Sequence, residues 1–181
     1  MDRPIWDILY DKYYSDNGPL RELLAVHSRK VADKALAIVD AHPELGADRR
    51  FVEEAAMLHD IGIFMTDADG IHCHGKANYI CHGYLGAELL EKEGLPRHAL
   101  VAERHTGTGL TLVQIESQNL PVPHRDMSPV SVEEQIICFA DKFFSKTRPE
   151  VEKSVEGAEK SLLKFGEDGI VKFRRWCSDF L

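Results

Sequence analysis

The apolar residues of this chain recur at helical intervals over most of its length. Between residues 18 and 39, Leu20, Leu24 and Val31 share one face when the chain is wound at 3.6 residues per turn. The alternation typical of strands is weak throughout, so the pattern predicts an all-α fold, a helical bundle. The expected helical segments are 18–39, 50–62, 97–107, 131–144, 151–165 and 169–180, with the last two packed on the outside of the bundle or at an oligomer contact.

Local signals mark where these segments begin and end. Pro19 is typical of a first helical turn, and Gly62 is a plausible stop for the second segment. Ser131 and Glu134 form a capping-box pattern at the start of the fourth. Residues 112–130 are rich in proline, which indicates a long irregular connection.

Ionisable side chains fall on the apolar faces of the helical segments, far apart along the chain. They are His27, His59, Asp60, His105 and Asp141. A lone histidine on such a face is more often a hydrogen-bonded core residue than a ligand, and the His59-Asp60 pair proves little alone. Burying the whole set is costly unless the groups share a compensating charge, and a divalent cation that binds imidazole and carboxylate supplies it. The set therefore predicts a metal site.

His82 passes the same test of helical spacing, although an ordinary residue at a helix start is the alternative. Gly83 and Gly86 beside it would let another backbone approach closely. The segment before it could be read as a zinc site formed by His72, Cys73, His74 and Cys81. Because the usual spacings of closed zinc sites are missing, a loop over the metal centre is favoured, with His74 or Lys76 as a candidate substrate contact.

Length and composition agree with a compact globular protein. The chain has 181 residues, of which 44% are hydrophobic, and we expect one domain spanning residues 1–181. Its four cysteines are scattered, which favours reduced thiols over a disulfide framework. We find neither an apolar run long enough to span a bilayer nor the core of a signal peptide, so no membrane partner and a cytoplasmic location are expected.

The formal net charge of -8 argues against a long nucleic acid as the ligand. A small phosphorylated molecule needs only a local cationic patch. Basic residues near the proposed ligands in sequence are Arg104, Lys142, Lys146 and Arg148, although each is more often a solvated surface charge. The expected substrate-binding residues are Lys76, Arg104, Lys142 and Arg148.

The order and context of the histidines and aspartates resemble the HD superfamily of metal-dependent phosphohydrolases, whose signature runs H, HD and a distant D. The matching segments are Ala25-Val-His-Ser-Arg-Lys-Val-Ala, Ala56-Met-Leu-His-Asp-Ile-Gly and Cys138-Phe-Ala-Asp-Lys-Phe. The segments Cys81-His-Gly-Tyr-Leu-Gly-Ala and Glu103-Arg-His-Thr-Gly resemble the added histidine motifs of the binuclear branch. The resemblance covers about residues 20–150 and implies an HD-type helical bundle, with residues 151–181 packed on it.

The resemblance also implies the ligands. His27, His59, Asp60 and Asp141 would hold one ion, and Asp60 would bridge to a second ion held by His82 and His105. The expected cofactors are two divalent ions, iron first by analogy with the binuclear relatives, with manganese or zinc as alternatives.

Two such ions lower the pKa of a bound water and neutralise charge on a phosphoryl group. We therefore expect hydrolysis of a phosphoester or phosphoanhydride by metal-activated hydroxide, with Asp60 as the catalytic residue. Ile63 and Phe64 stand where binuclear members often carry a basic residue that contacts substrate phosphate, and Lys76 is a candidate replacement. The segments around His82 and Asp141 are similar to the branch that cleaves dinucleoside tetraphosphates, so a nucleotide is the expected substrate.

Two other functions remain open at this point. Some HD-type proteins use the same ligand arrangement as di-iron oxygenases, and a noncatalytic nucleotide-binding protein would keep the ligands without turnover. A homodimer is also compatible with the sequence.

Overall fold

The computed structural model describes residues 3–181, and its secondary structure is almost entirely helical. The helices are α1 (Ile5–Tyr14), α2 (Gly18–Ala41), α3 (Arg49–Leu58), α4 (His82–Lys92), α5 (Pro96–Arg104), α6 (Leu112–Ser117), α7 (Val132–Asp141), α8 (Val155–Leu162) and α9 (Glu167–Phe180). A small antiparallel hairpin between α3 and α4 pairs β1 (Asp67–Ala68) with β2 (Cys73–His74). The predicted all-α fold is confirmed, with this hairpin as a departure from it.

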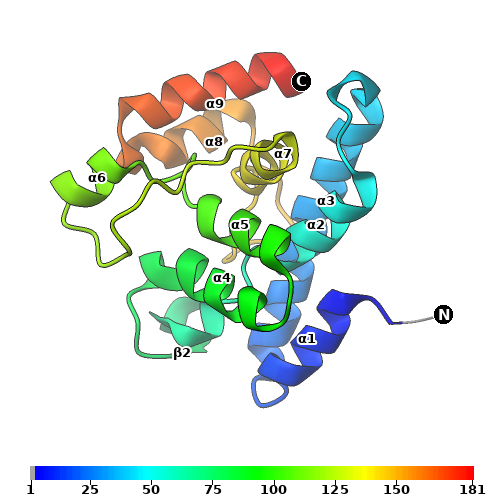
Figure 1. The fold of residues 1–181 in the computed structure, drawn as a ribbon, viewed down its shortest axis with the longest axis vertical. Helices are drawn as coiled ribbons and strands as arrows, with labels where there is room; N and C mark the ends of the chain where they lie inside the picture. The colour runs from blue at the N-terminus through cyan, green and yellow to red at the C-terminus, as the bar shows by residue number, and fades with distance from the viewer. Residues whose placement is uncertain (1–2) are drawn as a thin grey trace.

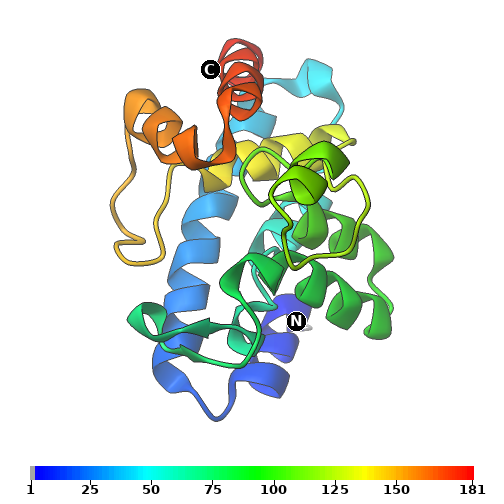
Figure 2. The same cartoon turned by 90° about the vertical axis from the view of Figure 1, so that its left-hand side faces the viewer.

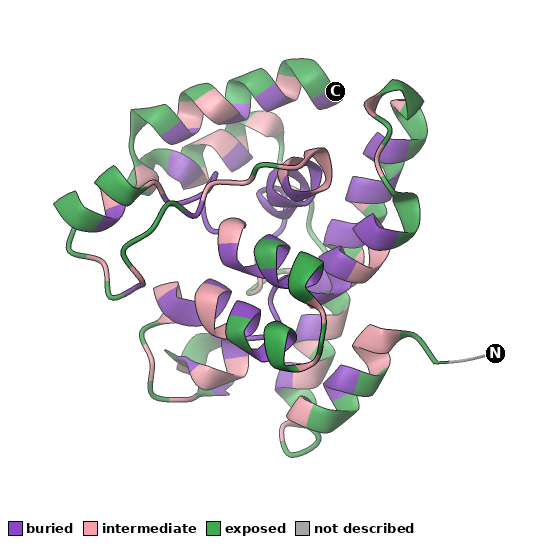
Figure 3. Ribbon diagram, viewed as in Figure 1, coloured by how far each residue is buried: buried purple, intermediate pink, exposed green. Residues whose placement is uncertain are grey.

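Helix α7 lies in the middle of the bundle (Figure 1). It packs against α2, α3 and α5, and α4 pairs with α5. Residues 136–141 of α7 are all buried, whereas most other helices bury one face only (Figure 3). The candidate metal ligands predicted from the sequence lie on these helices or directly after them. The packing around α7 therefore determines whether those side chains meet. Among residues 3–181, no helix combines the length and apolar composition needed to cross a bilayer.

Helix α2 is a 24-residue rod that runs along the molecule (Figure 2). Its N-terminus is capped by Asn17, whose side chain accepts a hydrogen bond from the Leu20 amide. The face that carries Leu20, Leu24 and Val31 is buried, as the periodicity predicts, and His27 lies on it.

The C-terminal helix α9 packs on α7 through aromatic side chains. The ring centroid of Phe139 lies 5.3 Å from that of Phe173 and 5.5 Å from that of Phe180. Helix α8 begins at Val155, later than predicted, because the Ser154 side chain caps it by accepting a hydrogen bond from the Gly157 amide. The packing of this segment on the bundle places α8 beside the cavity described below.

The expectation of an irregular connection over residues 112–130 is wrong at its start. Helix α6 occupies Leu112–Ser117 because Thr111 and Gln114 form a reciprocal capping box there.

The structure also shows α1, which the sequence pattern did not predict. Its Tyr14 hydroxyl donates a hydrogen bond to the Ile61 carbonyl oxygen at 2.7 Å, and this contact braces the turn that follows α3.

Glycines allow that turn to rest directly on α4. A Cβ placed on Gly62 would lie 2.3 Å from the His82 carbonyl oxygen and 2.5 Å from the Gly86 amide nitrogen. Gly83 is similarly close to the Ala102 carbonyl oxygen of α5, at 2.9 Å. The close approach predicted for the α4 glycines is therefore present, and it brings His82 against the segment that carries His59 and Asp60.

We expect Gly62→Ala to lower the free energy of unfolding by about 2–4 kcal/mol, because backbone atoms cannot yield to the added methyl group without displacing α4. Urea denaturation followed by circular dichroism measures the change. Gly70→Ala is the matched control, since its Cβ would meet open space, and it should alter stability by less than about 0.5 kcal/mol. Equal stability of the two variants would contradict the close packing of Gly62 on α4.

Candidate metal centre

Four of the predicted ligands converge at the centre of the bundle. His27 comes from the middle of α2, His59 and Asp60 directly follow α3, and Asp141 ends α7. The Nε2 atom of His27 lies 3.2 Å from Asp60 Oδ2 and 3.1 Å from Asp141 Oδ1, and His59 Nε2 lies 3.0 Å from Asp60 Oδ2. One donor atom from each residue falls within 4.8 Å of all the others. This set, the first ligand group, has the spacing of side chains around one ion.

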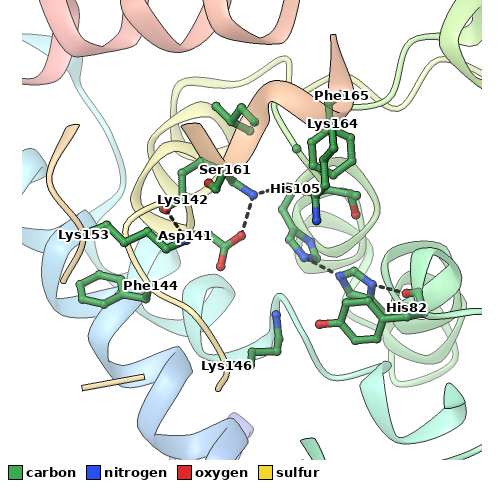
Figure 4. A pocket seen from close by; sticks show the side chains of 14 residues that line it. His82, His105, Asp141, Lys142, Phe144, Lys146, Lys153, Ser161, Lys164 and Phe165 are labelled. Atoms are coloured by element: carbon green, nitrogen blue, oxygen red, sulfur yellow. Dashed lines mark hydrogen bonds and ion pairs between the residues drawn. The ribbon is translucent and has the colours of Figure 1, made fainter. Parts of the chain in front are cut away.

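A second group shares Asp60. Its Oδ1 atom lies 3.4 Å from His82 Nε2 and 3.3 Å from His105 Nε2, and the two imidazole nitrogens are 3.0 Å apart. His82 begins α4 and His105 follows α5, so the pairing of those helices brings them together (Figure 4). Each oxygen of Asp60 therefore faces a different one of the two groups.

Hydrogen bonds to the backbone fix the orientation of three imidazoles. The Nδ1 atoms of His59, His82 and His105 lie 2.6, 2.6 and 2.7 Å from the carbonyl oxygens three residues earlier. A carbonyl oxygen only accepts, so each Nδ1 carries a proton, and in its neutral form each ring directs the Nε2 lone pair toward Asp60. Such backbone bonds are the usual support of histidines that bind metal.

This orientation explains why a cation fits. In the neutral rings, the lone pairs of His82 and His105 face each other at 3.0 Å with no hydrogen between them. His59 Nε2 and Asp60 Oδ1 are buried without a hydrogen-bond partner, and Asp60 Oδ2 has the Lys146 ammonium group 2.6 Å away. Unpaired buried acceptors that converge on one space are costly, and a divalent ion that binds imidazole nitrogen and carboxylate oxygen would satisfy them together.

The pKa values of the buried aspartate and histidines in the two groups also indicate that the site favours a cation. Burial by itself would raise the pKa of the Asp60 carboxyl, but His59 and Lys146 outweigh it and hold that pKa well below its usual range. Burial would also lower the pKa of His59, yet the carboxylates of Asp60 and Asp141 raise it to about 9. Burial, together with the facing His105, lowers the pKa of His82 to about 3. The carboxylates thus attract cations, while the second group keeps its imidazoles neutral and available as ligands.

A cavity of about 180 Å³ opens beside the two groups. His82, His105 and Asp141 line it, together with Lys142 and Lys146 (Figure 4). Lys142 Nζ donates to Asp141 Oδ2 at 2.7 Å and to the His105 carbonyl oxygen at 2.9 Å. Lys146 Nζ lies 2.6 Å from Asp60 Oδ2. A ligand in this cavity would touch the centre and its lysines at once.

Only some of the residues predicted to contact substrate line this cavity. Lys142 lines the cavity, whereas Arg104 Nη1 lies 2.9 Å from Glu134 Oε2 in a mostly buried ion pair. Lys76 and Arg148 are exposed and are not among the residues that line it. The remaining cationic lining comes from Lys146, which the sequence had placed near a ligand, and from Lys153 and Lys164, for which the sequence carried no signal.

The alternative zinc site is not assembled. His74 is exposed and lies 3.0 Å from Asp69, and the Cys81 thiol lies 3.1 Å from the Pro121 carbonyl oxygen, which it faces as a donor. Within residues 3–181, the His, Cys, Asp and Glu clusters with the spacing for a metal are the two groups that share Asp60.

Comparison with known proteins agrees with this arrangement. A family model described as the HD domain matches residues 24–145, which include His27, His59, Asp60 and Asp141. An uncharacterized protein of Methanocaldococcus jannaschii is 37% identical over 132 residues, which cover 72% of this chain and 69% of that protein. No solved structure matches the chain significantly.

Two further relatives are longer proteins named tRNA (cytidine(56)-2'-O)-methyltransferase. The one from Picrophilus torridus is 36% identical over 128 residues, covering 70% of this chain, and the one from Thermoplasma volcanium is 29% identical over 174 residues, covering 95%. The matches span only 33% and 45% of the length of these two proteins. The family match over residues 24–145, together with the bundle that brings its H, HD and D residues to one point, shows that this chain belongs to the HD domain family.

Proposed function

We propose that this protein is a metal-dependent phosphohydrolase of the binuclear HD type, which cleaves a phosphoester or phosphoanhydride bond of a small molecule. The observation that carries the proposal is Asp60, whose two oxygens each face a separate group of buried imidazole nitrogens. In this proposal His27, His59, Asp60 and Asp141 hold one ion, and Asp60, His82 and His105 hold the other. Iron is the first expected metal, and manganese or zinc also suits these ligands.

When bound, two divalent ions lower the pKa of a water molecule and neutralise charge on a phosphoryl group. The water oxygen then forms a bond to phosphorus, the bond from phosphorus to the leaving oxygen breaks, and the proton released by the water ends on the leaving group. Asp60 would hold both ions and accept a hydrogen bond from the attacking water, which would orient that water. The Lys142 and Lys146 ammonium groups line the cavity where nonbridging oxygens would lie and stabilise their charge.

We propose a nucleotide as the substrate. The segments around His82 and Asp141 resemble hydrolases of dinucleoside tetraphosphates, and this resemblance supports the proposal. The lysines beside the centre support a phosphorylated ligand despite the net charge of -8. Two relatives carry the name of a tRNA methyltransferase, but this chain matches 33% and 45% of their lengths. We propose that methyl transfer belongs to the part of those proteins outside the match, because a buried cluster of His and Asp suits metal-assisted hydrolysis.

The experiment that tests the proposal is a phosphate-release screen without oxygen. Wild-type protein loaded with Mn²⁺ or Fe²⁺ is incubated with nucleotides and with p-nitrophenyl phosphate, and inorganic phosphate is measured. Release under these conditions supports hydrolysis. Turnover that requires ferrous iron and consumes oxygen would instead support a di-iron oxygenase, and nucleotide binding with no turnover would support a noncatalytic binding protein.

We expect Lys146→Met to lower kcat/KM for phosphate release by about 10-fold to 100-fold, because an ammonium group beside Asp60 would stabilise charge that develops on the phosphoryl group. Bound metal, measured by mass spectrometry, should be retained. Lys160→Met changes an exposed lysine of α8 and should leave kcat/KM unaltered. Full activity of Lys146→Met would remove Lys146 from the proposed site.

A further inference from the structure

A buried lysine at the end of α7 connects the two ligand groups. Lys142 directly follows Asp141, and its side chain is 9% exposed. Its Nζ atom donates to Asp141 Oδ2 at 2.7 Å and to the His105 carbonyl oxygen at 2.9 Å. Asp141 belongs to the first ligand group alone, and His105 belongs to the second alone. One ammonium group is therefore hydrogen-bonded to a member of each group (Figure 4).

The bond to Asp141 gives the two oxygens of that carboxylate different surroundings. Oδ1 lies 3.1 Å from His27 Nε2 and 3.5 Å from His59 Nε2, so it faces the first group. Oδ2 faces the Lys142 ammonium group. Burial by itself would raise the pKa of the Asp141 carboxyl, but Lys142 and the two histidines hold that pKa well below its usual range. Lys142 thus keeps the carboxylate charged and leaves one of its oxygens for an ion.

The bond to His105 attaches the second group to the same helix end. The His105 carbonyl oxygen also faces the Cys138 thiol, a weak donor, at 3.4 Å. Cys138 and Lys142 are four residues apart, and Lys142 keeps helical dihedral angles as the C-cap of α7, so both side chains lie on one face. The His105 ring is held separately, because its Nδ1 donates to the Ala102 carbonyl oxygen of α5. The backbone of His105 is therefore fixed to α7 and its ring to α5.

The use of the Lys142 hydrogens indicates what this side chain does. An ammonium group carries three N–H donors, and Lys142 gives two of them to the protein. A lysine that served only to attract phosphate would keep its donors free for the cavity. Lys146 differs, because it pairs with Asp60, which both groups already share, and so adds no link between them. Lys142 links ligands that Asp60 alone does not hold together.

We infer that Lys142 is a positioning residue of the metal centre, which directs Asp141 Oδ1 toward the first ion and holds His105 at the second. This inference rests on the two-ion centre of the proposed function, but not on hydrolysis. It gives Lys142 a role separate from contact with substrate, for which its third N–H remains. Such hydrogen-bonding partners of metal ligands commonly set the affinity of a site.

Manganese binding by Lys142→Met tests the inference. Chelator-treated full-length protein is titrated with Mn²⁺, and free Mn²⁺ is measured by electron paramagnetic resonance. Lys142→Met should weaken the binding of both ions by about 10-fold to 100-fold, because Asp141 and His105 each lose a hydrogen bond that orients them. Lys142→Arg should stay within about 3-fold of the wild type, because its guanidinium keeps the charge and the donors. Binding by Lys142→Met as tight as that of the wild type would overturn the inference.

Lys146→Met separates positioning from charge. Each of these two methionine substitutions removes one ammonium group beside the metal ligands, and the loss of positive charge by itself favours cation binding. Lys146→Met should therefore bind Mn²⁺ at least as tightly as the wild type, in contrast to Lys142→Met. Lys160→Met, which changes an exposed lysine of α8, should leave the affinity unaltered. Tighter binding by both Lys142→Met and Lys146→Met would mean that charge alone accounts for Lys142.

Circular dichroism shows whether the variants fold. If Lys142→Met does not fold, Lys142→Gln takes its place, because its amide keeps a polar group beside the cavity. It is too short to bridge both acceptors as Lys142 does, so it should weaken Mn²⁺ binding by at least about 5-fold. Affinity equal to that of the wild type in Lys142→Gln would equally overturn the inference.

The inference and the proposed function fail in different ways. Absence of Mn²⁺ binding by the wild type would reject the two-ion centre and the inference with it. Two ions bound equally well by the wild type and by Lys142→Met would reject the positioning role and leave the centre standing. Weaker binding by Lys142→Met in a protein that releases no phosphate would retain the positioning role and reject the hydrolase.

Discussion

Asp60→Asn is expected to lower kcat/KM for phosphate release by about 1,000-fold or more, because it changes the one residue that both ligand groups share. The amide nitrogen that replaces one carboxylate oxygen cannot bind a cation. Whichever way the amide is turned, one ligand group loses an oxygen donor and the centre loses its bridging charge. Steady-state phosphate release and metal content measured on the same samples check the result.

Folding and contamination must be separated from this effect. Asp16→Asn changes an exposed carboxylate between α1 and α2 that belongs to neither ligand group, and it should retain wild-type activity. Circular dichroism should show helical content like that of the wild type for both variants. If Asp60→Asn released phosphate as fast as Asp16→Asn, the activity would belong to a contaminant or the reaction would not use this centre.

Metal loading is expected to raise the melting temperature by about 5–15 °C over that of chelator-treated protein. An ion that binds only the folded state at 100 to 1,000 times its dissociation constant stabilises it by about 3–4 kcal/mol. For a chain of this length each kcal/mol corresponds to about 2–4 °C. The stabilisation arises because the ion satisfies the buried acceptors of His59 and Asp60. Differential scanning fluorimetry with Mn²⁺, and with Fe²⁺ under nitrogen, measures the shift.

Single-ligand variants show which group each ion occupies. His27→Gln should remove the ion of the first group, and His82→Gln the ion of the second, each with part of the thermal shift. His124→Gln changes an exposed histidine and should keep both ions and the full shift. A melting temperature that does not respond to metal in the wild type would contradict metal binding by these side chains.

The fold and the candidate ligands followed from the sequence because they depend on short-range regularities. The 3.6-residue period of apolar positions places a residue on a helix face irrespective of its distant neighbours, so the buried faces of α2, α3 and α7 were predictable. A histidine or aspartate on such an apolar face is unexpected and therefore stands out in the sequence. His27, Asp60 and Asp141 were visible for that reason.

Errors arose where local capping chemistry or distant packing decided the structure. Helix α6 depends on the reciprocal bonds of Thr111 and Gln114, which the proline-rich surroundings concealed. Arg104 was expected to contact substrate because it precedes His105, but adjacent helical residues point in different directions, and Arg104 turns to Glu134. Lys153 and Lys164, which flank α8, reach the cavity only because the C-terminal segment packs back on the bundle.

The sequence by itself determined which segments are helical, which of their faces are buried and which polar residues those faces carry, because each of these properties is set within a few turns of chain. Only the tertiary structure decided that Asp60 stands between two sets of imidazoles, which nitrogen of each ring is free, and which lysines line the cavity. Those features depend on how helices far apart in sequence cross and approach, and close contacts such as Gly62 against α4 fix that geometry.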